Sequence, residues 1–134
     1  MYLPRNIWFV LVVIMISSCS TETLDVTSPT GKLGVTVEPM ERKAYDKITF
    51  SVNYDGKTIL SQTELGLETD VQKFYGNLKL KSVSKAKRIV DDYKMITGKR
   101  SHCINEAFER TYSFENQEGN TLDITFRVYD NGVV

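Results

Sequence analysis

A group of polar and aromatic residues between positions 93 and 106 has side chains of the types that bind ligands. It consists of Tyr93, Arg100, His102, Asn105 and Glu106. An aromatic face beside groups that form paired hydrogen bonds is typical of carbohydrate sites, because the ring covers one face of a sugar and the polar groups bind its hydroxyls. The same residues also have structural interpretations, with His102 half-buried and hydrogen-bonded, Asn105 in a turn and Tyr93 in the core.

The chain has one histidine, His102, and it directly precedes Cys103. Neighbouring residues on a strand point to opposite faces, so the imidazole cannot take a proton from this thiol. We therefore predict no catalytic thiol and expect Cys103 to lie in or near the core, as an unpaired cysteine of an exported protein usually does.

Four carboxylates lie close to the same segment: Asp91, Asp92, Glu106 and Glu109. Asp91 and Asp92 are neighbours and should diverge, and nothing in the sequence sets Glu106 against a second acid, so a solvated face explains them. Beyond the first 19 residues the chain offers one histidine and one thiol, too few for zinc, and Asp130–Gly132 is typical of a turn instead of a calcium loop. The sequence predicts no catalytic residue and no metal site in this chain.

The N-terminal segment differs from the rest of the chain. Residues 1–18 contain one charge, Arg5, and an unbroken apolar run, Ile7–Ile16. As a helix this run would be about 15 Å long, about half of a bilayer's hydrocarbon core, so a membrane span is not expected. A cationic start, an apolar stretch and then small residues are typical of a secretory signal peptide.

The end of this segment, Ile16–Ser20, resembles the bacterial lipobox, in which the cysteine is acylated and becomes the new N-terminus. The resemblance implies lipidation at Cys19, stable anchoring to a membrane without crossing it, and export to the periplasmic face or the outer membrane. The alternative is an ordinary signal peptide cut near Ser18 or Ser20. With Cys19 acylated, Cys103 would be the only thiol of the mature chain.

The overall composition describes one small domain. The chain has 134 residues, with 17 basic and 17 acidic side chains. This is too short for a catalytic (β/α)₈ barrel of about 250 residues. A formal net charge of zero provides no positive field for nucleic acid, so we expect no nucleic-acid partner.

The apolar residues of the mature chain alternate with a period of two, which predicts half-buried antiparallel strands. Asp55–Gly56 predicts a two-residue hairpin turn. Residues 83–92 fit either a short helix or a strand pair around Lys85–Arg88. The expected strands are Leu33–Val37, Ile48–Tyr54, Lys57–Leu60, Leu65–Thr69, Leu78–Ser84, Ile89–Thr97, Phe108–Glu115 and Leu122–Val128.

This pattern predicts an all-β protein, an antiparallel β-sandwich of two sheets. We expect a tether at 19–27, although Leu24 and Val26 alternate enough to begin a strand, and a domain at 28–134 that is incomplete at its C-terminus because a strand should start after Asp130–Gly132. A basic cluster is typical of the solvent-exposed side of an edge strand. The alternative is that the cluster contacts anionic lipid or acidic glycans. It comprises Lys79, Lys81, Lys85, Lys87 and Arg88.

Three ordered stretches resemble the N-terminal domain of glycoside hydrolase family 97, bacterial α-glucosidases and α-galactosidases common in Bacteroidetes. They are Ser28–Leu33, Phe50–Leu60 with Glu64–Leu67, and Phe126–Val133. The middle of the chain departs from the family pattern, where Gly98 and Asn105–Glu106 remain but the family's tryptophan and first glutamate do not.

The resemblance implies a galactose-mutarotase-like super-sandwich, incomplete here, in front of a catalytic (β/α)₈ barrel in the same polypeptide. It implies α-linked oligosaccharides as substrates and a calcium ion in the full-length family member, with no cofactor in this fragment. The polar group at 93–106 would then contact sugar or the barrel. The alternative is a stand-alone surface lipoprotein with an Ig-like or carbohydrate-binding sandwich.

Overall fold

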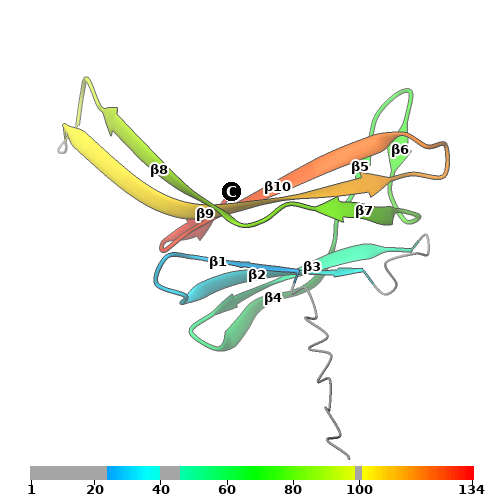
Figure 1. The fold of residues 1–134 in the computed structure, drawn as a ribbon, viewed down its shortest axis with the longest axis horizontal. Coiled ribbons are helices and arrows are strands. Elements are labelled where there is room, and N and C mark those ends of the chain that lie inside the picture. The colour runs from blue at the N-terminus through cyan, green and yellow to red at the C-terminus, as the bar shows by residue number, and fades with distance from the viewer. Residues whose placement is uncertain (1–23, 40–45, 99–100) are drawn as a thin grey trace, which may run out of the picture.

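The computed structural model describes residues 24–39, 46–98 and 101–134, and every regular element among them is a β-strand (Figure 1). This confirms the expected all-β class. Among these residues no helix is long and apolar enough to cross a membrane. The strands are β1 (Asp25–Thr27), β2 (Leu33–Pro39), β3 (Ile48–Tyr54), β4 (Lys57–Glu64), β5 (Leu67–Glu68), β6 (Lys73–Phe74), β7 (Lys79–Val83), β8 (Lys87–Lys94), β9 (His102–Glu115), β10 (Thr121–Tyr129) and β11 (Gly132–Val133).

The first sheet is antiparallel and has the order β1-β2-β3-β4. The predicted hairpin joins β3 to β4 through Asp55 and Gly56, whose φ angles of 48° and 76° are the positive values that a tight two-residue turn requires. β1 adds Asp25–Thr27 to the sheet, with Val26 buried. The residues expected to end the tether are therefore part of the sandwich.

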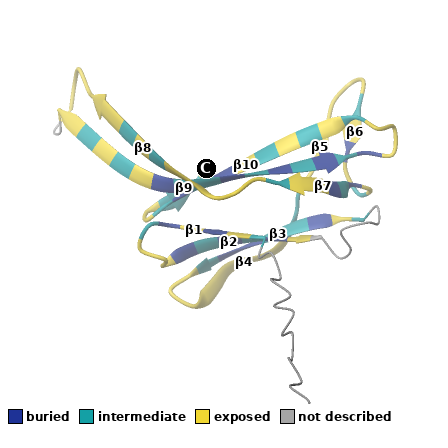
Figure 2. Ribbon diagram, in the orientation of Figure 1, coloured by how far each residue is buried: buried dark blue, intermediate teal, exposed yellow. Residues whose placement is uncertain are grey.

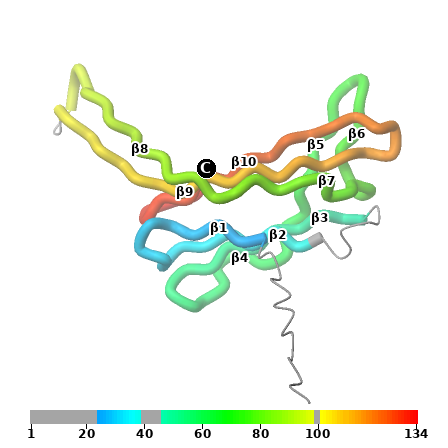
Figure 3. Tube along the Cα trace, in the orientation of Figure 1, coloured from blue at the N-terminus to red at the C-terminus, as the bar shows by residue number. Residues whose placement is uncertain are grey.

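The second sheet has the order β11-β10-β9-β7, and β8 also pairs with β9. β7 and β8 follow one another along the same edge of the long strand β9 (Figure 3). Residues 83–92 therefore form no helix, and β7 and β8 do not pair with each other, because each of them is hydrogen-bonded to β9. The expected strand at Leu65–Thr69 shrinks to β5, which pairs only with β6.

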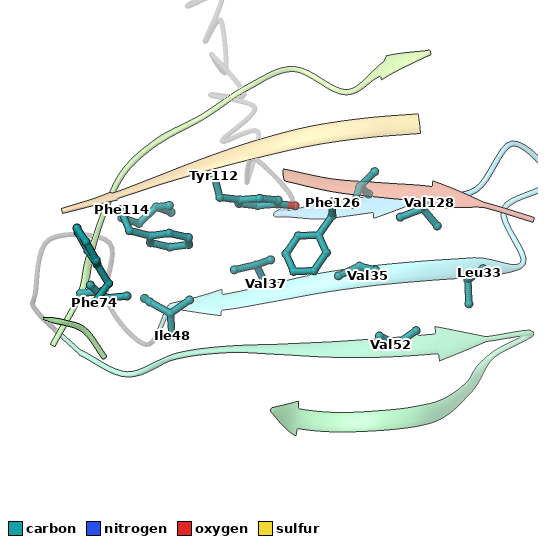
Figure 4. Close-up of a cluster of buried hydrophobic side chains, with 13 residues drawn as sticks. Leu33, Val35, Val37, Ile48, Val52, Phe74, Tyr112, Phe114, Phe126 and Val128 are labelled. Atoms are coloured by element: carbon teal, nitrogen blue, oxygen red, sulfur yellow. The ribbon is translucent and has the colours of Figure 1, made fainter. Parts of the chain in front are cut away.

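The core lies between the two sheets, and the first sheet covers only part of the second (Figure 2). Alternate residues of β2 face alternate residues of β9 and β10, so the period of two is satisfied on both sides. Phe126 stands between the sheets, with its ring centroid 5.5 Å from that of Phe50 and 5.9 Å from that of Tyr112 (Figure 4). Tyr112 and Phe114 are fully buried.

Polar contacts also join the two sheets. The Tyr112 hydroxyl donates to the Leu24 carbonyl oxygen over 2.6 Å, and burial raises the pKa of this phenol to about 12. At the edge of the sandwich Asp130 accepts hydrogen bonds from the Thr30 hydroxyl (2.6 Å) and amide (3.0 Å), and these bonds lower the pKa of the Asp130 carboxyl. The turn after β1 is thus fixed to the turn after β10.

Candidate functional site

The outer half of the β8–β9 hairpin projects beyond the first sheet (Figure 1). Residues 102–109 of β9 pair with β8, and the loop is closed by a hydrogen bond from the Met95 amide to the Ser101 carbonyl, 2.9 Å long. β10 ends opposite Ala107, so the edge of β9 before this residue has no strand partner on the β10 side among the described residues. The hairpin therefore presents two faces and one free edge.

One face of the hairpin continues the side of β9 that carries Tyr112 and Phe114, and we call it the core-side face. The register places Val90 opposite Glu106 and Ile104 opposite Asp92 on this face. The described strands of the first sheet do not extend over this part of the hairpin (Figure 1), and Val90 and Ile104 are 53% and 59% exposed. Two polar pairs flank these apolar side chains, an ion pair with Arg88 Nη2 2.6 Å from Glu106 Oε2 and a hydrogen bond with His102 Nε2 2.5 Å from Asp92 Oδ1.

The opposite face of the second sheet, the outer face, carries a polar network across three strands. The Tyr129 hydroxyl of β10 donates to Asp91 Oδ2 of β8, so the side chain reaches across β9, where Ala107 opposite it is fully buried. Arg127 donates to Glu109 Oε2 from Nε (2.9 Å) and Nη2 (2.6 Å), and its Nη1 lies 3.8 Å from Asp91 Oδ1. Hydrogen bonding to Glu109 raises the pKa of the Arg127 guanidinium.

Two hollows adjoin this network. One, of about 400 Å³, lies on the outer face and is lined by Asp91, Tyr93, Asn105, Tyr129, Asn131 and Val134. The other, of about 340 Å³, is lined by Pro29, Ile104, Asn105, Glu106, Tyr129, Asp130 and Asn131. The two share Asn105, Tyr129 and Asn131, and together we call them the edge groove, since they meet beside the free edge of β9.

The polar and aromatic residues predicted between positions 93 and 106 lie on two different faces of the hairpin. Tyr93 and Asn105 lie on the outer face, and His102 and Glu106 extend from the core-side face. Tyr93, Asn105 and Glu106 line the edge groove, and His102 does not. The structural interpretations are wrong for two residues: Tyr93 is 47% exposed instead of in the core, and Asn105 lies within β9 instead of in a turn. His102 is hydrogen-bonded but exposed.

Two predicted residues lie outside the described part of the chain, namely Cys19 and Arg100. Sequence reasoning also missed Asp91 and Tyr129 as lining residues of the edge groove. The sequence marks Asp91 only as a possible catalytic acid, and it contains Tyr129 only as part of the family-like stretch Phe126–Val133. Their meeting depends on the order of β8, β9 and β10 in the sheet, which no local sequence signal encodes.

The expectations about acid–base and metal chemistry can be compared with the geometry. Asp91 and Asp92 diverge as predicted, one toward Tyr129 and the other toward His102. Cys103 is half-buried and pairs across the ladder with Tyr93, on the face opposite His102. Within residues 24–39, 46–98 and 101–134 no three His, Cys, Asp or Glu side chains lie close enough together to hold a metal ion.

A third hollow, of about 610 Å³ and mostly apolar, adjoins the edge groove, with which it shares Asp130 and Asn131. It opens where β4 and β11 form the edges of their sheets, and Leu33, Val52 and Leu60 contribute to its wall. Its polar side chains are Tyr54 and the shared Asp130 and Asn131, whereas the edge groove adds the carboxylates of Asp91 and Glu106, the Asn105 amide and two phenol rings. The edge groove is therefore the stronger candidate for a binding site.

Comparison with known proteins agrees with this architecture. A model of the family described as glycosyl-hydrolase 97 N-terminal matches residues 26–134. No curated protein matches the chain. Among solved structures, a β-arabinopyranosidase is similar at 36% identity and a TM-score of 0.72, over 81% of this chain and 17% of that one.

Two further structures are of a glycoside hydrolase family 97 enzyme from Pseudoalteromonas sp. strain K8, one in complex with panose and one with acarbose. Each is 21% identical, with a TM-score of 0.70, over 81% of this chain and 16% of the other. The chain thus spans about a sixth of the length of these structures, and the likeness to them shows the fold of this portion. Since the family model covers most of the chain, the protein belongs to the glycosyl-hydrolase 97 N-terminal family.

Proposed function

We propose that this chain is the non-catalytic N-terminal domain of a family 97 glycoside hydrolase that acts on α-glycosides, and that it supports the catalytic domain and contributes to carbohydrate binding. The observation that carries the proposal is the projecting hairpin. Val90 of β8 and Ile104 of β9 are exposed on the core-side face, and farther along β9 this face is buried in the core. The catalytic domain in the same polypeptide is the partner that covers them.

The chemistry of the hairpin suits such an interface. Apolar side chains surrounded by charged groups resemble the pattern of a protein interface, with an apolar centre and a polar rim. Met95 and Ile96 extend the apolar surface to the tip, where Ile96 is fully exposed. Arg88 forms an ion pair with Glu106 and the His102 ring is hydrogen-bonded to Asp92, so both carboxylates keep a partner when the face is covered.

The comparisons support the enzymatic context. The similar structures include a β-arabinopyranosidase and family 97 enzymes in complex with panose and acarbose, and all are about six times longer than the matched portion. Substrate and activity therefore belong to the longer enzyme that we propose. Within it, the hairpin would place the edge groove beside the catalytic domain.

The test is to replace Val90 and Ile104 together by aspartate in the full-length enzyme. We expect domain association to weaken by about 2 kcal/mol, because two apolar contacts become buried charges. The catalytic and N-terminal domains should then unfold in separate calorimetric transitions, and kcat/KM for an α-glucoside should fall about tenfold. Ile59→Asp is the control, since Ile59 is 64% exposed on β4. Unchanged cooperativity and activity in the double variant would contradict this role.

Export and lipid anchoring at Cys19 are a further part of the proposal, supported by the lipobox-like Ile16–Ser20. The enzyme would be held on the periplasmic side or at the outer membrane by acyl chains. In cells fed radiolabelled palmitate, we expect the wild-type protein to carry label and to sediment with membranes, and Cys19→Ser to do neither. Label retained by Cys19→Ser would show that Cys19 is not the acylated residue.

A further inference from the structure

We infer that the edge groove is an oligosaccharide subsite that takes one neutral pyranose residue, with Tyr93 as its platform and Asn105 and Asp91 as its hydroxyl-binding groups. The sugar class rests on the proposed function. The position and the residues rest on the geometry of β8, β9 and β10.

The platform is the Tyr93 side chain, which is about half exposed at the wall of the outer-face hollow. It lies on the same face as Asp91, two residues earlier in β8, and Asp91 is directly opposite Asn105 in the ladder. Side chains directly opposite one another on antiparallel strands have Cβ atoms about 5 Å apart. The Asp91 carboxylate and the Asn105 amide can thus form hydrogen bonds with neighbouring hydroxyls of one sugar ring while the Tyr93 ring covers its C–H face.

The polar groups have unused hydrogen-bonding capacity. Asn105 is half-buried, and no hydrogen bond engages its side chain within the part of the chain that the structure describes. Its amide offers two donors and one acceptor. Asp91 accepts from Tyr129 and lies near Arg127, which leaves further lone pairs on its two oxygens.

The same contacts preorganise the subsite. Tyr129 and Arg127 hold Asp91 from the neighbouring strand β10, and Glu109 in turn holds Arg127. All of these side chains stand on paired strands instead of loops. Binding therefore requires little ordering of the protein, which is the condition for measurable affinity from a small contact area.

The charge of the groove selects a neutral ligand. Its lining includes the carboxylates Asp91, Glu106 and Asp130 but no lysine or arginine. The nearby guanidinium of Arg127 is engaged by Glu109. Glu106 is paired with Arg88 and Asp91 shares Arg127 with Glu109, so the negative charge left at the groove is that of Asp91 and Asp130. This charge repels an anionic sugar, whereas the hydroxyls of a neutral sugar can donate to the carboxylates.

The test is titration of the full chain, purified in detergent, with panose and with a triuronic acid, followed by NMR chemical shifts. We expect panose to bind with a dissociation constant of about 1 mM and to shift the amides of β8 and β9 around Asp91, Tyr93 and Asn105, and the triuronic acid to shift none. Tyr93→Ala and Asn105→Ala should each weaken panose binding at least about tenfold. Tyr75→Ala is the matched control, because Tyr75 is 60% exposed and lies beside Asn116–Glu118, in the turn at the opposite end of β9 from the hairpin.

Panose shifts that map elsewhere, no binding to a folded wild-type chain, or equal weakening by Tyr75→Ala would each overturn the inference. Equal binding of the triuronic acid would overturn the neutral selectivity. If a variant fails to fold, the wild-type shift map still decides the location of the site. The titration contains no catalytic domain, so it can fail while the docking experiment on Val90 and Ile104 succeeds, and the reverse also holds.

Discussion

Replacing Phe126 by alanine is expected to lower the free energy of unfolding by about 4 kcal/mol. Phe126 extends from β10 into the space between the sheets and contacts the rings of Phe50 and Tyr112. Truncation removes the transfer free energy of the ring and leaves a cavity, because paired strands on both sides prevent the sheets from closing. Loss of two ring contacts adds to this cost.

The measurement is urea unfolding of the purified chain, monitored by circular dichroism. Asp123→Ala is the control, because Asp123 lies on the same strand but points outward and is exposed, and its replacement should change stability by less than about 0.5 kcal/mol. A loss below about 1 kcal/mol in Phe126→Ala would show that the two sheets do not depend on this aromatic cluster.

Replacing Arg110 by methionine is expected to cost about 3 kcal/mol. Arg110 is 7% exposed on the core side of β9, and its guanidinium donates to two backbone carbonyls. Nε reaches the Ser84 oxygen between β7 and β8 over 2.8 Å, and Nη1 reaches the Asp25 oxygen of β1 over 2.9 Å. Methionine keeps most of the apolar stem of the buried Arg110 but leaves both carbonyls without their charged donor.

Arg88→Met provides the comparison for Arg110→Met in the same unfolding experiment. Arg88 also loses a close partner, Glu106, but its side chain is 60% exposed, so the pair is screened by water and its loss should cost less than about 0.5 kcal/mol. Equal stability of the two variants would show that the guanidinium of Arg110 does not stabilise the junction of the two sheets.

Local features of the sequence were sufficient for much of the fold. The period of two along Leu33–Val37 and Leu122–Val128 predicted strands on the two sides of the core, and Asp55–Gly56 predicted the turn between β3 and β4. Each of these signals lies within about ten residues, where strand and turn preferences act directly. The all-β class and the sandwich followed from their number and spacing.

The candidate site was harder to predict because it depends on pairing between distant segments. β9 begins at His102, six residues before the expected strand, and this early part carries Asn105 into the middle of a sheet. Tyr129 reaches Asp91 only because β10 and β8 lie on either side of β9, and no turn signal in the sequence predicts this order of strands. Arg110 likewise appears as an ordinary charged residue until β1 and the segment after β7 provide its two carbonyls.

The continuity of β9 has a mechanical consequence. Its 14 residues form one strand about 45 Å long, with the Tyr112 end embedded between the sheets and the His102 end in the projecting hairpin. Because the strand is continuous, the hairpin cannot change its position relative to the sandwich without disturbing Tyr112 and Phe114. Substitutions that loosen the packing around Tyr112 and Phe114 should therefore change the entropy of binding at the hairpin, although these two residues lie outside the edge groove.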